Sequence, residues 1–188
     1  NDLIGLVPYL AQNLPDTQFI SPDAPYPCDM APFGRQWFTL QDWSLESIHK
    51  GVLNVWPVLE SFIEQQRKRF DLPANKTALA GFSQGACMAL HAGLHYGKKL
   101  AGVLSYSGWL SGADVISPAS IQKPPVCLIH GEADEVVPVI AWHKTKDWLE
   151  AQSYQVSGHT MPGFGHGIDE KGIEAGTAFL SSVLKSAA

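Results

Sequence analysis

The sequence predicts an α/β fold with a mostly parallel sheet covered by helices on both faces, and three observations carry this prediction. Runs of apolar, β-branched and aromatic residues alternate along the chain with segments of helical periodicity, as in proteins built from strand–helix–strand units. The composition is that of a globular protein, with 45% hydrophobic and 16% charged residues. A chain of 188 residues can bury one sizeable core, so we expect a single domain over residues 1–188.

The first part of the chain predicts a helix over Asp2–Asn13, a strand over Thr17–Ser21 and a long helix over Ser44–Phe70. The long helix is the clearest element because its apolar residues recur every 3.6 positions, and Pro57 is expected to kink or split it. The segment Pro22–Trp43 has no sustained period but is rich in prolines and aromatics. It is a packed surface loop, the wall of a binding groove, or both.

The second part of the chain alternates regularly between the two kinds of pattern. The apolar run "TALAGF" ends in a glycine-containing turn, and a helical pattern of small residues, "ACMALHAGL", follows it. Strands are expected over Thr77–Phe82, Gly102–Ser107, Val126–His130 and Tyr154–Met161, and helices over Gln84–His95, Ile140–Gln152 and Ile168–Lys185.

Charge and hydropathy exclude two classes of partner. The net charge is −5, and the one basic cluster, Arg67–Arg69, ends a helical pattern, where positive charge complements the helix dipole. We therefore expect no nucleic-acid partner. The segment Thr77–Tyr96 lacks Asp, Glu, Lys and Arg, but its serine, glutamine, histidines and glycines argue against a span, so no stable membrane insertion is expected.

The cysteines indicate a reducing environment. Cys28, Cys87 and Cys127 are three in number and irregularly spaced, which fits neither a disulfide framework nor a zinc site. Cys87 and Cys127 lie in apolar surroundings and are most simply buried thiols. We therefore expect a cytoplasmic protein without a metal site, and no signal peptide is visible at its start.

Ser83 is the candidate nucleophile. It lies in "GFSQG", between a strand pattern and a helix pattern, which is the setting of the nucleophile elbow in G-x-S-x-G hydrolases. Gly81 and Gly85 lack Cβ atoms, so the strand and the helix can approach closely. The backbone N–H of Gln84, at the start of the helix, would then point at the developing oxyanion.

A serine nucleophile needs a base, and in this setting the order along the chain is serine, acid, histidine. His166 lies in the glycine-rich segment "GFGHGID", after the last strand and before the last helix, and is the favoured base. The competing histidines are less suitable: His143 and His159 lie in regular patterns typical of structural histidines, and His130 precedes the best acid.

The acid is expected in "LIHGEADEVVP", after the strand that ends at His130. Asp134 lies in the turn before an expected helix, where its carboxylate could accept the His166 N–H and hold its tautomer. Glu132 and Glu135 are more simply solvated turn charges, and Asp114, after the preceding strand, is the second choice.

Three segments, "GFSQGACMAL", "HGEADEVVP" and "PGFGHGID", resemble in order the motifs of the carboxylesterase/phospholipase family of α/β-hydrolases, which includes acyl-protein thioesterases and lysophospholipases. The segments "FISPDAPYP" and "YSGWL" resemble further parts of that family, so the likeness covers essentially the whole chain. It implies an α/β-hydrolase fold and a serine esterase or thioesterase, with Ser83 as nucleophile, Asp134 as acid and His166 as base.

The resemblance also implies an acyl groove. Trp37 and Phe38 from the long loop, and Trp109 and Leu110 from "SGWL", are its expected substrate-binding residues. The connections between strands are short, which leaves no room for a large cap domain. An open groove suited to small or medium acyl chains is therefore expected.

The chain departs from the family pattern at its start. The family has a strand before the segment that matches "NDLIGL", and a His-Gly loop after that strand supplies a second oxyanion N–H. Because the fold needs that strand in mid-sheet, we expect about 25–40 further residues upstream, enough for a strand or two and a loop. In the chain as given, the domain is then N-terminally incomplete.

These residues together predict a serine hydrolase that cleaves carboxylic esters or thioesters through an acyl-enzyme, with a small-molecule substrate and no cofactor. The alternatives are a non-catalytic binding module on a hydrolase scaffold, and a dienelactone-type or peptidase specificity on the same fold. Exposed aromatic residues in the long loop could also support a homodimer.

Overall fold

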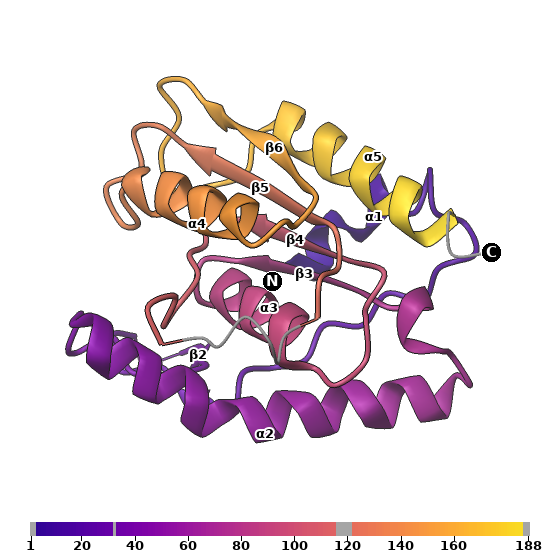
Figure 1. The fold of residues 1–188 in the computed structure, drawn as a ribbon, viewed down its shortest axis with the longest axis horizontal. Helices are drawn as coiled ribbons and strands as arrows, with labels where there is room; N and C mark the ends of the chain where they lie inside the picture. Colours follow the sequence, from indigo (N-terminus) through magenta and orange to yellow (C-terminus); the bar gives the residue numbers. More distant parts are fainter. Residues whose placement is uncertain (1–2, 32, 116–121, 186–188) are drawn as a thin grey trace.

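The computed structural model describes residues 3–31, 33–115 and 122–185 of the chain. Its centre is a parallel sheet of four strands in the order β3-β4-β5-β6 (Figure 1). The strands are β3 (Ala78–Phe82), β4 (Gly102–Tyr106), β5 (Val126–Gly131) and β6 (Val156–Met161). Parallel strands that alternate with helices confirm the predicted α/β fold.

Helices cover both faces of the sheet because successive strand residues point to opposite sides. On one face, Val103 and Leu128 share a core cluster with Leu90 and Leu149. On the other face, Leu104 and Ile129 pack with Leu10 and Leu180. The covering helices are α3 (Gln84–His95) and α4 (Ile140–Ala151) on the first face, and α1 (Val7–Leu10) and α5 (Glu170–Lys185) on the second (Figure 1).

The long helix α2 (Leu45–Arg69) packs outside α3 and begins at Ser44, whose side chain accepts the Ser47 N–H. The expected split at Pro57 does not occur: the helix continues as one element, and its ribbon bends (Figure 1). Proline leaves the carbonyl of Leu53, four residues earlier, without its helical partner. Both residues are exposed, so water can replace the lost hydrogen bond.

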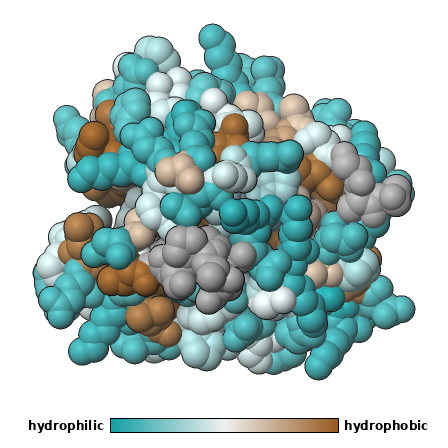
Figure 2. Space-filling model, viewed as in Figure 1, coloured by the Kyte–Doolittle hydropathy of each residue, from teal (hydrophilic) through white to brown (hydrophobic). Residues whose placement is uncertain are grey.

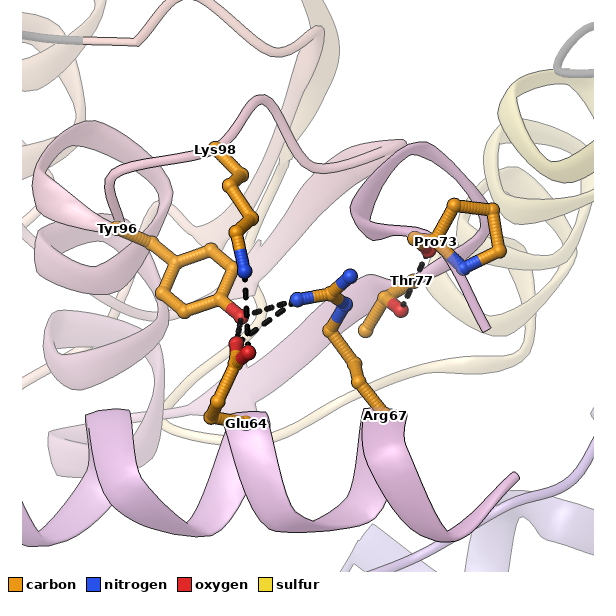
Figure 3. A network of polar contacts seen from close by, with 6 residues as sticks. All are labelled: Glu64, Arg67, Pro73, Thr77, Tyr96 and Lys98. Atoms are coloured by element: carbon orange, nitrogen blue, oxygen red, sulfur yellow. Dashed lines mark hydrogen bonds and ion pairs between the residues drawn. The ribbon is translucent and has the colours of Figure 1, made fainter. Parts of the chain in front are cut away.

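A polar network ties α2 to the connection between α3 and β4 (Figure 3). The Glu64 carboxylate accepts hydrogen bonds from the Tyr96 hydroxyl, from Arg67 Nη1 at 2.8 Å and from Lys98 Nζ at 3.0 Å. Arg67 also donates to the Tyr96 oxygen. The four side chains fix the second half of α2 beside the end of α3.

The amino-terminal part differs from the prediction. Thr17–Ser21 forms no strand and is paired with none of the described strands. The expected helix over Asp2–Asn13 is shorter: a 3₁₀ turn over Leu3–Leu6 precedes α1, and Asp2 lies outside the described residues.

The segment Pro22–Trp43 is mostly irregular, as expected, but contains two short antiparallel strands, β1 (Tyr26–Pro27) and β2 (Arg35–Gln36). The Arg35 guanidinium donates to the carbonyls of Ala24 and Pro25, which holds the hairpin against the chain that leads into it. A short 3₁₀ turn, η2 (Ala74–Lys76), leads from α2 into β3.

Hydrophilic side chains cover most of the face seen in Figure 2, with apolar side chains in separate patches. Within the described ranges, no helix is both long and apolar enough to cross a bilayer. Cys87 and Cys127 are buried, as expected, and all three cysteines are free thiols.

Candidate active site

Ser83 lies in the sharp turn between β3 and α3. Its backbone has φ 53° and ψ −121°, a strained conformation of the kind that gathers at functional sites. The Ser83 N–H donates to the Tyr106 carbonyl at 2.9 Å, and its own carbonyl accepts the N–H groups of Ala86 and Cys87, each at 3.0 Å. These bonds fix Ser83 at the carboxyl edge of the sheet, where its side chain is partly exposed.

Only one of the two flanking glycines is required by the turn. A Cβ atom on Gly81 would lie 2.2 Å from the Gly85 carbonyl oxygen, so the strand and the helix approach too closely for any side chain there. A Cβ on Gly85 would meet only Trp37 Nε1, at 3.9 Å, an ordinary contact. The expectation that both glycines serve the close approach is therefore right for Gly81 and wrong for Gly85.

Asp134 and His166 form a hydrogen-bonded pair at the same edge of the sheet. The His166 Nδ1–H donates to Asp134 Oδ2 at 2.7 Å. The other carboxylate oxygen, Oδ1, accepts the N–H groups of Val136 at 2.9 Å and Val137 at 2.8 Å. The Asp134 side chain is fully buried, whereas that of His166 is 18% exposed, so the imidazole is the member of the pair that a substrate can reach.

The environment keeps the Asp134 carboxyl ionised. Burial by itself would raise the pKa of Asp134, but the hydrogen bonds from His166, Val137 and Val136 outweigh it and lower that pKa below its ordinary value. A carboxylate in this position holds the imidazole with its Nδ1 protonated and Nε2 free to accept a proton.

The loops that carry the acid and the base are joined through their backbones. The Ala133 N–H donates to the Phe164 carbonyl at 2.8 Å, and the Glu132 N–H donates to the Met161 carbonyl at 3.0 Å. Gly131, the last residue of β5, permits this approach: a Cβ there would lie 2.3 Å from the Gly165 carbonyl oxygen. Asp134 and His166 therefore meet because β5 and β6 are adjacent strands and the loops after them are joined by backbone hydrogen bonds.

Ser83 is connected to this pair through its neighbour in the chain. The His166 ring packs against the ring of Phe82, with 4.7 Å between ring centroids and 43° between the planes. The Ser83 hydroxyl makes no hydrogen bond to any described residue, His166 included. Loose nucleophile–base contacts are common before substrate binds and tighten in the reacting complex.

The competing residues lie elsewhere or serve other roles. His130 is fully buried, its Nε2–H donates to the Val137 carbonyl at 2.7 Å, and burial lowers its pKa against the opposing effects of Val137 and Asp134. His143 and Asp114 are exposed, and Glu132 accepts the Thr160 hydroxyl. The candidate acids and bases that take no part in the Asp134–His166 hydrogen bond are His130, His143, His159, Asp114, Glu132 and Glu135.

Gln84 is the first residue of α3, where backbone N–H groups have no partner within the helix and the helix dipole is positive. Its N–H is thus suited to an oxyanion next to Ser83.

The four residues expected to line an acyl groove differ in exposure. Trp37 is partly exposed, whereas Phe38, Trp109 and Leu110 are 3%, 9% and 8% exposed and belong to the core clusters. Of the four, Trp37 is therefore the most exposed.

Two features of the site carry no clear signal in the sequence. His130, which sequence order excludes as the base, supports the acid loop through the Val137 carbonyl, and its Nε2 lies 3.4 Å from Asp134 Oδ2. The Gln84 side chain bonds to the backbone of the long loop, 47 residues away at Trp37. The Gln84 contact joins segments distant in sequence, which no local pattern reveals. The His130 contacts span only seven and four residues, but the sequence does not show which neighbour the ring meets. The described residues contain no cluster of three or more His, Cys, Asp or Glu side chains arranged to hold a metal ion.

Comparison with known sequences identifies relatives over nearly the whole chain. The sequence model of the family described as phospholipase/carboxylesterase matches residues 1–184. Acyl-protein thioesterase 1 of Neurospora crassa is 30% identical over 94% of this chain and 78% of its own length. Acyl-protein thioesterase 1 of Gibberella zeae is 29% identical over 92% of this chain and 80% of its own.

Comparison with solved structures shows that the fold is shared as well. The crystal structure of esterase PE8 is 36% identical in sequence, with a TM-score of 0.92 over 97% of this chain and 86% of that chain. The Bacillus cereus carboxylesterase, at 16% identity, has a TM-score of 0.80 over 97% of this chain and 84% of its own, which is a likeness of fold alone.

Proposed function

Because the chain belongs to the phospholipase/carboxylesterase family of α/β-hydrolases, we propose that Ser83, Asp134 and His166 carry its hydrolytic chemistry. The protein is a serine hydrolase that cleaves carboxylic esters or thioesters. The observation that supports this assignment of residues best is the 2.7 Å hydrogen bond between His166 and a buried, ionised Asp134, beside the strained turn of Ser83.

In the proposed reaction, Ser83 Oγ attacks the acyl carbonyl carbon while His166 Nε2 takes the hydroxyl proton. The negative charge moves to the carbonyl oxygen, where the Gln84 N–H donates to it. The C–O or C–S bond then breaks, and His166 returns the proton to the departing alkoxide or thiolate. An acyl-enzyme remains on Ser83.

Water completes the cycle. His166 accepts a proton from the water that attacks the acyl-enzyme, the Ser83 ester bond breaks, and the proton passes to Ser83 Oγ as the carboxylic acid leaves. Asp134 keeps its charge throughout and stabilises the imidazolium formed in each half of the reaction. No step of this sequence calls for a metal ion or an organic cofactor.

The expected substrates are small or medium acyl esters and thioesters, with Trp37 contacting the acyl chain. The names of the relatives, acyl-protein thioesterase and esterase, favour such substrates over the alternatives of a binding module or a dienelactone-type or peptidase activity. Exposed Met30, Phe33, Trp43 and Leu45 support association of two copies, which sedimentation over a concentration series would test.

The role of Ser83 is tested by its replacement with alanine. Hydrolysis of p-nitrophenyl butyrate by Ser83→Ala should fall by a factor on the order of 10⁴ or more, because the acyl-enzyme cannot form. Ser61→Ala, which removes an exposed hydroxyl on α2, should keep wild-type turnover. Turnover by folded Ser83→Ala close to that of wild type would reject the assignment.

A further inference from the structure

The side chain of Gln84 clamps the long loop onto the helix of the nucleophile. Gln84 Oε1 accepts the backbone N–H of Trp37 at 3.1 Å, and Gln84 Nε2 donates to the backbone carbonyl of Phe38 at 2.8 Å. The same residue therefore presents its backbone N–H to the reaction and its amide group to the loop that leads from β2 into α2.

Only a primary amide of this length satisfies both contacts. The loop offers one donor, the Trp37 N–H, and one acceptor, the Phe38 carbonyl, so its partner must accept and donate side by side. Glutamate lacks the donor, leucine lacks both groups, and asparagine is one methylene shorter. The pairing resembles one rung of a β-ladder, with the Gln84 amide in place of a peptide group.

The clamp holds two aromatic residues with different environments. Phe38 is 3% exposed, and a Cβ on Gly51 of α2 would lie 2.7 Å from its Cβ, so Phe38 anchors the loop in the core. Trp37 is only partly buried, and its Nε1 lies 3.9 Å from the position of a Cβ on Gly85, at the start of α3. The clamp thus fixes the indole of Trp37 beside the turn that carries Ser83.

We propose that the Gln84 side chain is a positioning residue that sets acyl-chain preference by fixing Trp37 beside the nucleophile. The proposal rests on the proposed function for the identity of the substrate, but the clamp itself is independent of turnover. The proposal predicts that loss of the clamp weakens the binding of long acyl chains more than that of short ones, because a long chain has more apolar surface to place against the Trp37 indole than an acetyl group has.

Gln84→Glu and Gln84→Leu, which are close in size to glutamine, test the clamp, and kcat and KM are measured for p-nitrophenyl acetate and hexanoate. The ratio of kcat/KM for hexanoate to that for acetate should fall on the order of tenfold, mainly through a higher KM for hexanoate. The matched control is Gln65→Leu, an exposed glutamine on α2, which should leave both substrates unaffected.

Amide hydrogen exchange supplies a readout that does not depend on activity. In Gln84→Leu the Trp37 amide should exchange about tenfold faster or more, while amides in the middle of α3 keep their protection and report an intact fold. An unchanged Trp37 amide would overturn the clamp. An equal loss of kcat/KM for both esters, with KM unchanged, would show a merely structural role and overturn the proposed control of chain preference. A wild-type enzyme without esterase activity would reject the proposed function but leave the exchange result decisive for the clamp.

Discussion

At the scale of single residues, Asp134 is the group on which the electrostatics of the site depend. Its buried side chain accepts three hydrogen bonds, from His166, Val136 and Val137. Its pKa is lower than usual, so the sign of its effect on stability is fixed: the carboxylate stabilises the fold above the pKa of the unfolded chain, and this contribution is lost as pH falls through the folded value. At neutral pH the negative charge beside His166 is fully present.

Asp134→Asn should therefore lower kcat on the order of 10⁴-fold, because the amide carries no charge to stabilise the imidazolium and can favour the wrong tautomer. Glu135→Gln removes the adjacent, exposed carboxylate and should keep wild-type kcat within about twofold. Steady-state hydrolysis of p-nitrophenyl butyrate measures both. An Asp134→Asn enzyme that retains a tenth of wild-type kcat would contradict the assigned role.

At the scale of elements, the turn from β3 to α3 decides whether the nucleophile is presented. The strand ends at Phe82, the helix begins at Gln84, and Ser83 between them is held at positive φ. This geometry needs the backbone of Gly85 to pass directly over Gly81. The local sequence is sufficient to predict this turn, since strand, serine, helix and the glycine before the serine are contiguous.

Gly81→Ala should lower the free energy of unfolding by about 2 kcal/mol or more, because its Cβ would overlap backbone atoms that cannot rotate away. Turnover should fall with it, since any relief of the overlap displaces Ser83. Gly97→Ala is the control, because a Cβ at that exposed position meets nothing within 4 Å. Urea denaturation compares the variants, and equal stability of Gly81→Ala and wild type would refute the close approach.

The sequence predicted the regular elements better than the contacts between segments that are far apart in the chain. The strands β3 to β6 and helices α2 to α5 lie within a few residues of their expected bounds, because each is a long or strongly apolar pattern. Thr17–Ser21 was wrongly predicted as a strand, because an apolar run cannot show whether a neighbour will pair with it. The pairing of Asp134 with His166 followed from chain order, whereas the contacts of Gln84 with Trp37 and Phe38 depend on packing between distant segments that no local pattern contains.

At the scale of the whole molecule, the network around Glu64 joins the outer helix α2 to the connection between α3 and β4 (Figure 3). The Tyr96 hydroxyl, then Lys98 and Arg67, lower the pKa of Glu64 from 4.5 to about 2. A folded-state pKa below the unfolded one means that ionised Glu64 stabilises the fold at neutral pH. That contribution is lost as the pH falls through the interval between 4.5 and about 2.

Glu64→Gln should therefore be less stable than wild type near neutral pH, and the difference should shrink as the pH is lowered toward the folded pKa of about 2. Glu60→Gln, one turn earlier on α2, is the control for the loss of a carboxylate from this helix. Thermal unfolding over a pH series measures the effect. A Glu64→Gln difference that is constant across the series would show that ionisation of Glu64 is not linked to folding.

The central claim is that Ser83 is the nucleophile, and labelling with a fluorophosphonate probe followed by peptide mapping of the intact protein tests it most directly. The probe reacts only with a serine activated by its base, so the account predicts one adduct per chain, on the peptide that contains Ser83. Asp134→Asn should label much more slowly, and Ser83→Ala should not label. A folded wild-type protein that stays unlabelled, or that carries the adduct elsewhere while the Ser83 peptide is unmodified, would contradict the account.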